Sequence, residues 1–284
     1  MNAIIERVFV AIIMTSLSNN SNSLPQLRYE RKYLIPSHCP EYLETLVMMH
    51  PFFFKQIYHP RIINNIYFDN HTLDSYFANL DGLGDRHKYR VRWYSPVVKE
   101  GNIKTTLTTN TSSPHFEIKH RAGDSIRKFL FSSGTAYQAI HQLLPVEIRN
   151  LFALESSINE NDLSGQSHGV SLSHVKTLKP IIFNSYERKY FLSHNKKVRV
   201  TIDSQVKFLE IRNGTINWTR VWLLPATILE IKGELADDSL IAECAKYLPL
   251  PLTKSSKYVL GVMSCLPDIE SPLYNIPVRP KLMA

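Results

Sequence analysis

Basic side chains recur at every second position in several segments of this 284-residue chain. In the segment HKYRVRWYS, Lys88, Arg90 and Arg92 alternate with aromatic or apolar residues. Residues two apart project from the same side of a β-strand, so these three cations would share one face. The guanidinium fork of arginine binds two oxygens of one phosphate group at once. The pattern therefore indicates a strand that presents cations to a phosphate-bearing ligand.

The pentapeptide YERKY occurs twice, starting at Tyr29 and at Tyr186. If both copies are strands, Glu30 and Lys32 share one face of the first copy. In the second copy Arg188 shares its face with the two tyrosines, and its neighbours point the other way. The repeat therefore indicates a shared architecture for two strands, with different side chains facing the ligand in each.

The fold class follows from the elements that must position these residues. Eight segments alternate with period two, which is typical of strands: 27–35, 63–70, 87–95, 115–123, 185–193, 197–204, 206–214 and 227–234. Short helical patterns lie between them at 37–50, 71–82, 134–152 and 237–248.

The ordinary interpretation of such strands is an antiparallel sheet with its charged face in solvent. Here arginine dominates that face, and many arginines together repel unless an anion or interleaved carboxylates neutralise them. A sheet that closes with this face inward gives a tunnel lined with cations. We therefore expect an α+β fold, a closed eight-stranded antiparallel β-barrel with flanking short helices.

Composition supports an anionic partner. Lysine and arginine number 33 against 25 acidic residues, a net charge of +8. The three cysteines are far apart and show no metal-ligand spacing, which favours a reduced, cytoplasmic protein. No glycine pattern of a P-loop or a dinucleotide fold occurs, so a nucleotide would be held by its triphosphate. Nucleic acid is not expected, because the aromatic residues largely lie on the face opposite the arginines.

The ends of the chain differ from its middle. Residues 1–26 are expected to be a poorly structured extension, and the apolar run from Val8 to Met14 is too short to span a bilayer. No stable membrane insertion is expected. The segment 155–179 is interpreted as an insertion within a single domain, 27–266, and 267–284 as a tail.

The chain resembles a known family over most of its length. The segments RYERKY, NNIYFDN, DRHKYRVRWY, FEIKHR, SYERKYF, VRVTID, ILEIKGE and LTKSSKYVLG follow in order the pattern of the VTC domain, a member of the CYTH-like triphosphate tunnel metalloenzymes. The resemblance runs from about Arg28 to Gly261. It implies a tunnel that binds triphosphates and Mn²⁺ or Mg²⁺. In members of the VTC type it also implies growth of inorganic polyphosphate from ATP.

The same resemblance implies roles for individual residues. The catalytic phosphate contacts it implies are Arg90, Arg92, Lys119, Arg188, Arg199 and Lys257, and the substrate-binding residues are Lys32, Arg86, Ser256 and Lys232. Glu230 is the implied metal ligand, and Glu30 is a weaker one. Glu117 and Asp203 are either weaker metal candidates or salt-bridge partners that hold a neighbouring arginine in place.

One departure from the superfamily pattern bears on the reaction. Many tunnel hydrolases begin with Glu-x-Glu-x-Lys, and this chain has Arg28-x-Glu30-x-Lys32. The replacement of one acid by a base favours an ATP-dependent polyphosphate polymerase over a hydrolase that uses two metals. The alternatives that remain are a triphosphatase of the same fold and a non-catalytic polyphosphate-binding module. The oligomeric state is left open.

Overall fold

A computed structural model describes residues 28–36, 40–97, 112–123, 125–132, 134–152, 172–253, 255–266, 269 and 280–283. Its strands are β1 (Arg28–Pro36), β2 (Lys55–Asp69), β3 (Asp85–Pro96), β4 (His115–Ala122), β5 (Ser125–Phe131), β6 (Lys179–Leu192), β7 (Arg199–Arg212), β8 (Thr215–Leu223), β9 (Ala226–Glu234) and β10 (Lys281–Leu282). Its helices are α2 (Pro40–Met48), α3 (Asp74–Leu80), α5 (Gly134–Gln142), α6 (Val146–Arg149), α7 (Leu172–Thr177), α8 (Asp238–Lys246) and α9 (Lys257–Cys265), with a 3₁₀ turn at Leu235–Asp237.

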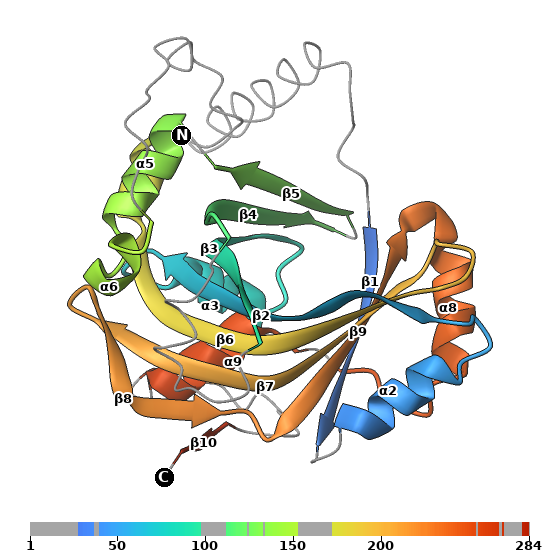
Figure 1. Ribbon diagram of the computed structural model, residues 1–284. Coiled ribbons are helices and arrows are strands. Elements are labelled where there is room, and N and C mark those ends of the chain that lie inside the picture. The colour runs from blue at the N-terminus through green and yellow to red at the C-terminus, as the bar shows by residue number, and fades with distance from the viewer. Residues whose placement is uncertain are drawn as a thin grey trace.

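The strands form one antiparallel sheet that curls around a central space (Figure 1). The order across it is β1-β9-β7-β6-β2-β3-β4-β5, while β8 pairs with β7 and β10. The pairing of β2 with β6 shifts register at three places, and such irregularities bend a sheet and increase its twist.

The prediction of a closed barrel is wrong. The ends of the sheet, β1 and β5, approach each other, but no backbone ladder joins them among the described residues. A side-chain contact bridges this side instead, since Lys119 Nζ on β4 lies 2.9 Å from Glu30 Oε2 on β1. Alternation along a strand fixes which face a side chain takes. It does not fix the tilt and stagger that close a barrel, so the sequence pattern could not decide closure.

The predicted strands differ from the observed ones in two further ways. The segments 197–204 and 206–214 are parts of the single strand β7, which is irregular around Gln205, a residue with a φ of 53°. Strands β5, β8 and β10 and helices α7 and α9 were not predicted. The predicted helices at 37–50, 71–82 and 237–248 correspond to α2, α3 and α8, and the one at 134–152 is divided into α5 and α6.

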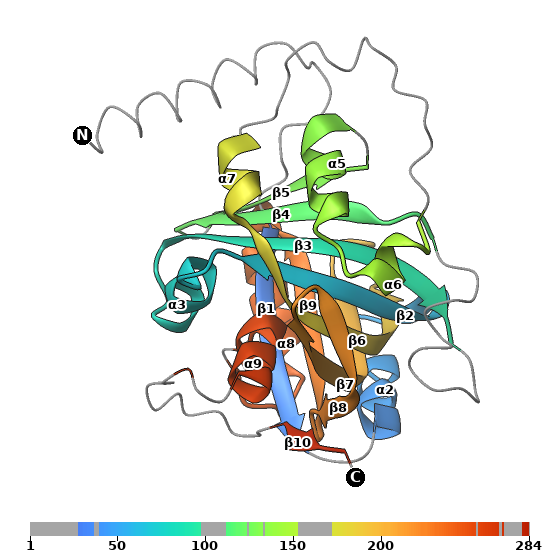
Figure 2. The same ribbon diagram turned by 90° about the vertical axis from the view of Figure 1, so that its left-hand side faces the viewer.

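Two apolar layers cover the outer face of the sheet. Helices α5 to α7 lie over β3 and β4, where Trp93 and Phe116 are fully buried (Figure 2). Helices α2 and α8 lie over β7 and β9, where Val200 and Leu229 are fully buried (Figure 1). These layers fix the outward set of residues on each strand and so direct the alternate residues inward.

Helix α9 packs against the inner face. Tyr258 stacks on Tyr67 of β2 at 5.2 Å between ring centroids, and Leu260 and Val262 join the same buried cluster as Ile182 of β6. Ser256 caps the helix by accepting a hydrogen bond from the N–H of Val259. The helix thereby fills part of the space inside the curled sheet and places its first residue beside the inward charges.

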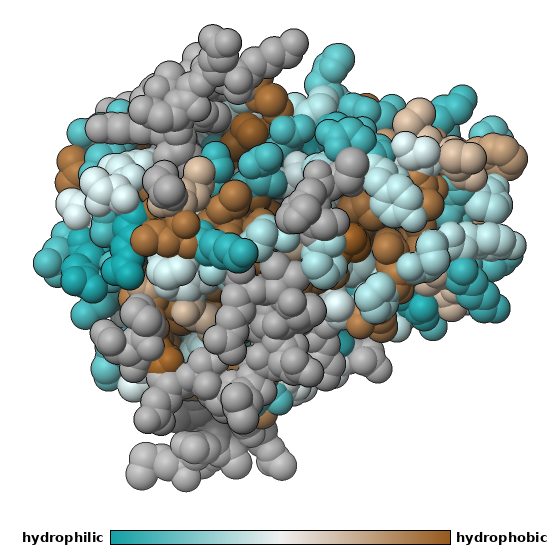
Figure 3. All heavy atoms as spheres, turned by 90° about the horizontal axis from the view of Figure 1, so that it is seen from below, coloured by the Kyte–Doolittle hydropathy of each residue, from teal (hydrophilic) through white to brown (hydrophobic). Residues whose placement is uncertain are grey.

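The molecular surface seen from below mixes hydrophilic and hydrophobic residues, with no single kind covering it (Figure 3). Within the described part of the chain, no helix is long and apolar enough to cross a bilayer. The run Val8–Met14 and the expected tail lie largely outside the described residues.

Candidate active site

The inner face of the sheet carries charged side chains from seven strands and the start of α9. Its cations are Lys32, Lys88, Arg90, Arg92, Lys119, Lys128, Arg188, Arg199, Lys232 and Lys257. Its carboxylates are Glu30, Glu117, Asp203 and Glu230. The cations outnumber the carboxylates, so this face has an excess of positive charge.

A buried ion cluster centres on Asp203 of β7. The guanidinium of Arg188 donates two hydrogen bonds to its carboxylate, and the Lys257 ammonium lies against the same group. Burial raises the pKa of Asp203, but the two cations outweigh that effect and hold the pKa below its usual value. Asp203 is thus an ionised partner that fixes one arginine and one lysine, the salt-bridge role that the sequence left open.

A second cluster joins Glu30 on β1 with Glu230 on β9. Lys32 Nζ lies 3.3 Å from Glu30 Oε1 and 3.2 Å from Glu230 Oε1, so it bridges the two acids. Lys232 also contacts both, and Lys119 contacts Glu30. Burial raises the pKa of Glu230, yet the surrounding ammonium and guanidinium groups hold it well below the usual value.

Glu117 on β4 forms a third cluster. Arg90 Nε donates to Glu117 Oε2 at 2.6 Å, Lys128 Nζ lies 2.7 Å from Oε1, and His115 Nε2 lies 2.8 Å from Oε1. The Glu117 side chain is 1% exposed. It therefore acts as a structural partner that orients Arg90 and draws Lys128 from β5 toward the inner face.

Two cations have only neutral hydrogen-bond partners among the described residues. Arg92 donates to the Asn65 side-chain oxygen at 2.8 Å and to the Tyr186 hydroxyl at 3.2 Å. Lys88 donates to Ser256 Oγ at 3.0 Å. Neither cation forms an ion pair with a carboxylate of the described residues, so these groups are the natural contacts for an incoming anion.

The expected site residues are brought together unevenly. The structure gathers Arg90, Arg92, Lys119, Arg188, Lys257, Lys32, Lys232 and Ser256 on or beside the inner face with Glu30 and Glu230. Two others stand at the margin of this face. Arg199 is exposed at the start of β7, opposite Lys232 of β9, and Arg86 directs its guanidinium to the Leu83 carbonyl in the turn before β3.

Lys88 shares the inward face of β3 with Arg90 and Arg92, as the alternation predicts, although the family resemblance gives it no role. Burial lowers its pKa well below the usual lysine value, and Lys32, Lys119 and Arg86 lower it further. The signal that identifies it is its position two residues before Arg90.

Mn²⁺ and Mg²⁺ prefer hard oxygen ligands. Glu230 and Glu30 lie side by side and supply carboxylate oxygens. Both carboxylates are ionised and enclosed by cations, which disfavours a bare divalent ion. Mg²⁺ commonly uses one or two protein carboxylates together with phosphate oxygens of the substrate. The residues therefore fit a metal that arrives with a phosphate chain.

Comparison with solved structures gives distant similarity. A proposed adenylate cyclase from Vibrio parahaemolyticus is 10% identical with a TM-score of 0.45, covering 84% of this chain and 99% of that one. A protein from Pyrococcus horikoshii is 11% identical with a TM-score of 0.41, covering 83% and 98%. A protein from Hippeastrum, proposed as an adenylyl cyclase and described with a dominant triphosphatase activity, is 14% identical with a TM-score of 0.39, covering 84% and 96%.

Comparison with family models gives a match that covers most of the chain. The model of the VTC domain matches residues 27–266, which include every strand from β1 to β9 and the helix α9 that carries Lys257. With the inward cations and carboxylates placed as described above, this chain belongs to the VTC domain family.

Proposed function

We propose that this protein is an ATP-dependent polyphosphate polymerase, which transfers the γ-phosphoryl group of ATP to the end of a growing phosphate chain. The observation that carries the proposal is the charge arrangement of the inner face. Its four carboxylates are each held by cations, and Arg92 and Lys88 have only neutral partners among the described residues. A ligand with closely spaced negative charges supplies the counter-ions that this face lacks.

The reaction needs positioning and charge neutralisation more than covalent help. The terminal oxygen of the acceptor chain attacks the γ-phosphorus, a new P–O–P bond forms, and the bond to the bridging oxygen of ADP breaks. Arg90 and Arg188 are held in fixed orientation by Glu117 and Asp203, so little reorganisation accompanies the transfer. A Mn²⁺ or Mg²⁺ ion on Glu230, with Glu30 beside it, would neutralise phosphate charge when bound.

A polymerase fits this face better than a hydrolase does. The end of a phosphate chain is ionised near neutral pH, so it needs no strong general base. Water needs one, or a second metal. The candidate bases among the described inward residues are His115 and the carboxylates of Glu30, Glu117, Asp203 and Glu230. All four carboxylates bind cations that lower their basicity, and His115 Nε2 is engaged with Glu117 Oε1 at 2.8 Å.

Separation of the products on a gel tests the proposal. The purified chain is incubated with ATP and Mn²⁺, with and without a short polyphosphate primer. We expect a ladder of phosphate chains together with ADP. Orthophosphate without chains would indicate a triphosphatase, and the absence of turnover with retained polyphosphate binding would indicate a binding module.

A matched pair of variants ties the product to the inner face. Arg188→Ala removes an inward guanidinium, and Lys189→Ala removes the next residue of β6, which points outward to Glu44 of α2. We expect the ladder to be lost in the first variant and kept in the second. Equal activity in the two variants would contradict the assignment of the inner face.

A further inference from the structure

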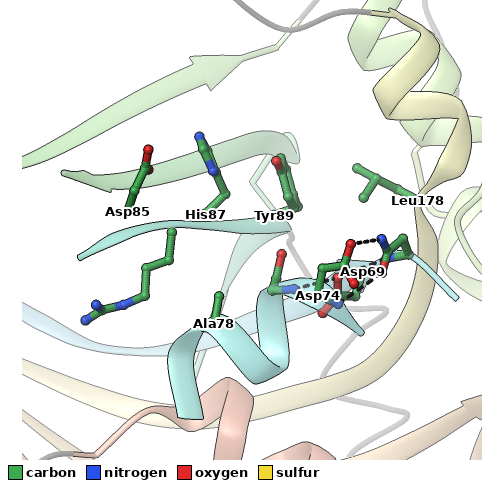
Figure 4. A pocket seen from close by; sticks show the side chains of 10 residues that line it. Asp69, Asp74, Ala78, Asp85, His87, Tyr89 and Leu178 are labelled. Atoms are coloured by element: carbon green, nitrogen blue, oxygen red, sulfur yellow. Dashed lines mark hydrogen bonds between the residues drawn. The ribbon is translucent and has the colours of Figure 1, made fainter. Parts of the chain in front are cut away.

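Three side chains that ligate metals meet on the outer face of the sheet, on the other side of β3 from Lys88. Asp85 and His87 belong to β3, and His120 stands opposite His87 on β4. Their ligand atoms all lie within 4.8 Å of one another. Figure 4 shows Asp85, His87 and Tyr89 projecting from β3 to the same side.

The geometry of the trio suits a shared ion. The imidazole rings of His87 and His120 stack with centroids 4.2 Å apart and an interplanar angle of 3°. His120 Nε2 lies 2.7 Å from Asp85 Oδ1. The strand pairing holds the two histidines opposite each other, and Asp85, whose side chain is 76% exposed, has room to turn from His120 toward an ion. The lone pairs of two stacked imidazoles run parallel, so one ring must tilt for both nitrogens to bind the same ion, while the strand pairing keeps them within reach of each other.

The surroundings carry charges of both signs, since Asp69, Asp74 and Arg86 border the adjoining cavity. A cavity of about 180 Å³ adjoins the trio, bordered by Asp69 and Asp74 as well as by Asp85 and His87 (Figure 4). Asp69 accepts hydrogen bonds from the backbone N–H groups at the start of α3 and from the Tyr258 hydroxyl. The carboxylate of Asp69 is therefore occupied by structural hydrogen bonds. The metal ligands that remain beside this cavity are Asp85 and the two histidines.

We propose that Asp85, His87 and His120 bind a divalent transition-metal ion, with Zn²⁺ the best suited, at a site separate from the active site. Two imidazole nitrogens and one carboxylate oxygen are a common zinc donor set. Mg²⁺ and Ca²⁺ prefer oxygen donors throughout, which Glu230 and Glu30 provide inside the sheet. The outer and inner faces of the sheet thereby select different metals.

An ion at this site links β3 to β4 at the end where Arg86 and Lys88 alternate with its ligands. It fixes the hairpin that also carries Lys119, whose ammonium contacts Glu30 on β1. Binding of Zn²⁺ therefore stabilises the strand pair that supports part of the active site, and the unfolding temperature rises with it.

Calorimetric titration of the full chain with Zn²⁺, after removal of metals by a chelator and in excess Mg²⁺, tests the proposal. We expect one equivalent to bind. His87→Ala and His120→Ala should each weaken binding by about tenfold or more, because even residues behind the ligands change metal affinity by about 10- to 100-fold. His194→Ala, in the exposed turn after β6, and Glu230→Gln should leave the affinity unchanged.

Two further measurements show whether the ion binds at this site rather than at the active site, and whether a variant loses binding because it misfolds. Co²⁺ in place of Zn²⁺ should give a visible absorption band that disappears in both histidine variants, and Asp85→Asn at its exposed position should weaken binding with an unchanged circular dichroism spectrum. Unchanged Zn²⁺ affinity in His87→Ala and His120→Ala would overturn the proposal. Loss of binding in Glu230→Gln alone would do so too, because the ion would then lie inside the sheet.

Discussion

Arg92 is 7% exposed and donates to an amide oxygen and a hydroxyl, neither of which carries a full negative charge. Arg90 and Arg188, by contrast, each face a carboxylate that holds the guanidinium in one orientation. The inner face thus combines arginines with fixed orientation and cations without a counter-ion. The first kind shapes the site, and the second gives the attraction for phosphate.

Arg92→Ala tests the role of the cations that have no carboxylate partner. A charge-assisted hydrogen bond to phosphate contributes about 1.5–3 kcal/mol, so we expect polyphosphate affinity and transfer rate to fall by about tenfold to hundredfold. Titration with a short polyphosphate measures the affinity. Lys189→Ala is the control, and a loss in Arg92→Ala no larger than in this control would contradict the role given to Arg92.

Lys88 gives a prediction about pH. Its pKa in the folded chain is lowered, so between that value and the ordinary lysine value the unfolded chain holds more protons than the folded one. Stability then increases with pH across this window, which means that a charged Lys88 costs stability at neutral pH. Lys88→Met should raise the unfolding temperature at neutral pH in phosphate-free buffer.

The same variant should bind polyphosphate more weakly, because the anion loses a contact. The difference in the free energy of unfolding between Lys88→Met and the natural chain should shrink as the pH rises toward the pKa of an ordinary lysine. Thermal unfolding across this range checks it. A Lys88→Met protein that is less stable at neutral pH would show that Lys88 is already neutralised by an acid.

At the scale of elements, α9 depends on a close approach at Gly261. A Cβ placed there would lie 2.3 Å from Ile182 Cδ1 on β6 and 2.8 Å from Phe208 Cδ1 on β7. Gly261→Ala therefore overpacks the inner cluster, and we expect a loss of about 1–3 kcal/mol in the free energy of unfolding. Gly84→Ala, where the new Cβ meets nothing within 4 Å, is the control.

Denaturant unfolding of the two variants decides this prediction. Because Lys257 stands at the first turn of α9 and contacts Asp203, displacement of the helix in Gly261→Ala should also reduce activity. Equal stability of the two glycine variants would mean that α9 does not pack into the sheet as described.

The elements also show how far sequence reasoning reaches. Alternation in 87–95 and 115–123 predicted β3, β4 and the inward set Arg90, Arg92 and Lys119, because one face must be apolar under the outer helices. Helix α9 has almost no exposed side, so its sequence lacks the one-sided polar pattern that identifies a surface helix. Strand β7 was divided in two because the irregularity at Gln205 shifts the alternation.

The site was predictable to the same extent. The sequence and the family pattern named most of the residues that meet inside the sheet, but they could not say which carboxylate binds which cation. That pairing depends on strand order and register, and it is what separates Arg90, held by Glu117, from Arg92, which has neutral partners. Arg199 was expected among the phosphate contacts, but it is exposed at the start of β7. Alternation predicts the face on which a side chain lies, and it does not predict which part of that face is buried.

At the scale of the whole molecule, the inward cations outnumber the inward carboxylates among the described residues, and a bound anion would balance the excess. The chain is an open, curled sheet with α9 packed against its inner face, and the cations lie beside that helix. Polyphosphate should therefore stabilise the fold, and the effect should weaken with rising salt, because part of the site is open to solvent screening.

The most direct test of the central claim is a ³¹P NMR time course with ATP and Mg²⁺, chosen because paramagnetic Mn²⁺ broadens the signals. The account predicts growth of the signal of internal chain phosphates, matched one for one by the formation of ADP, and loss of both in Glu230→Gln. Formation of ADP with orthophosphate alone, and no internal phosphate signal, would contradict the claim that the inner face transfers phosphate to a chain.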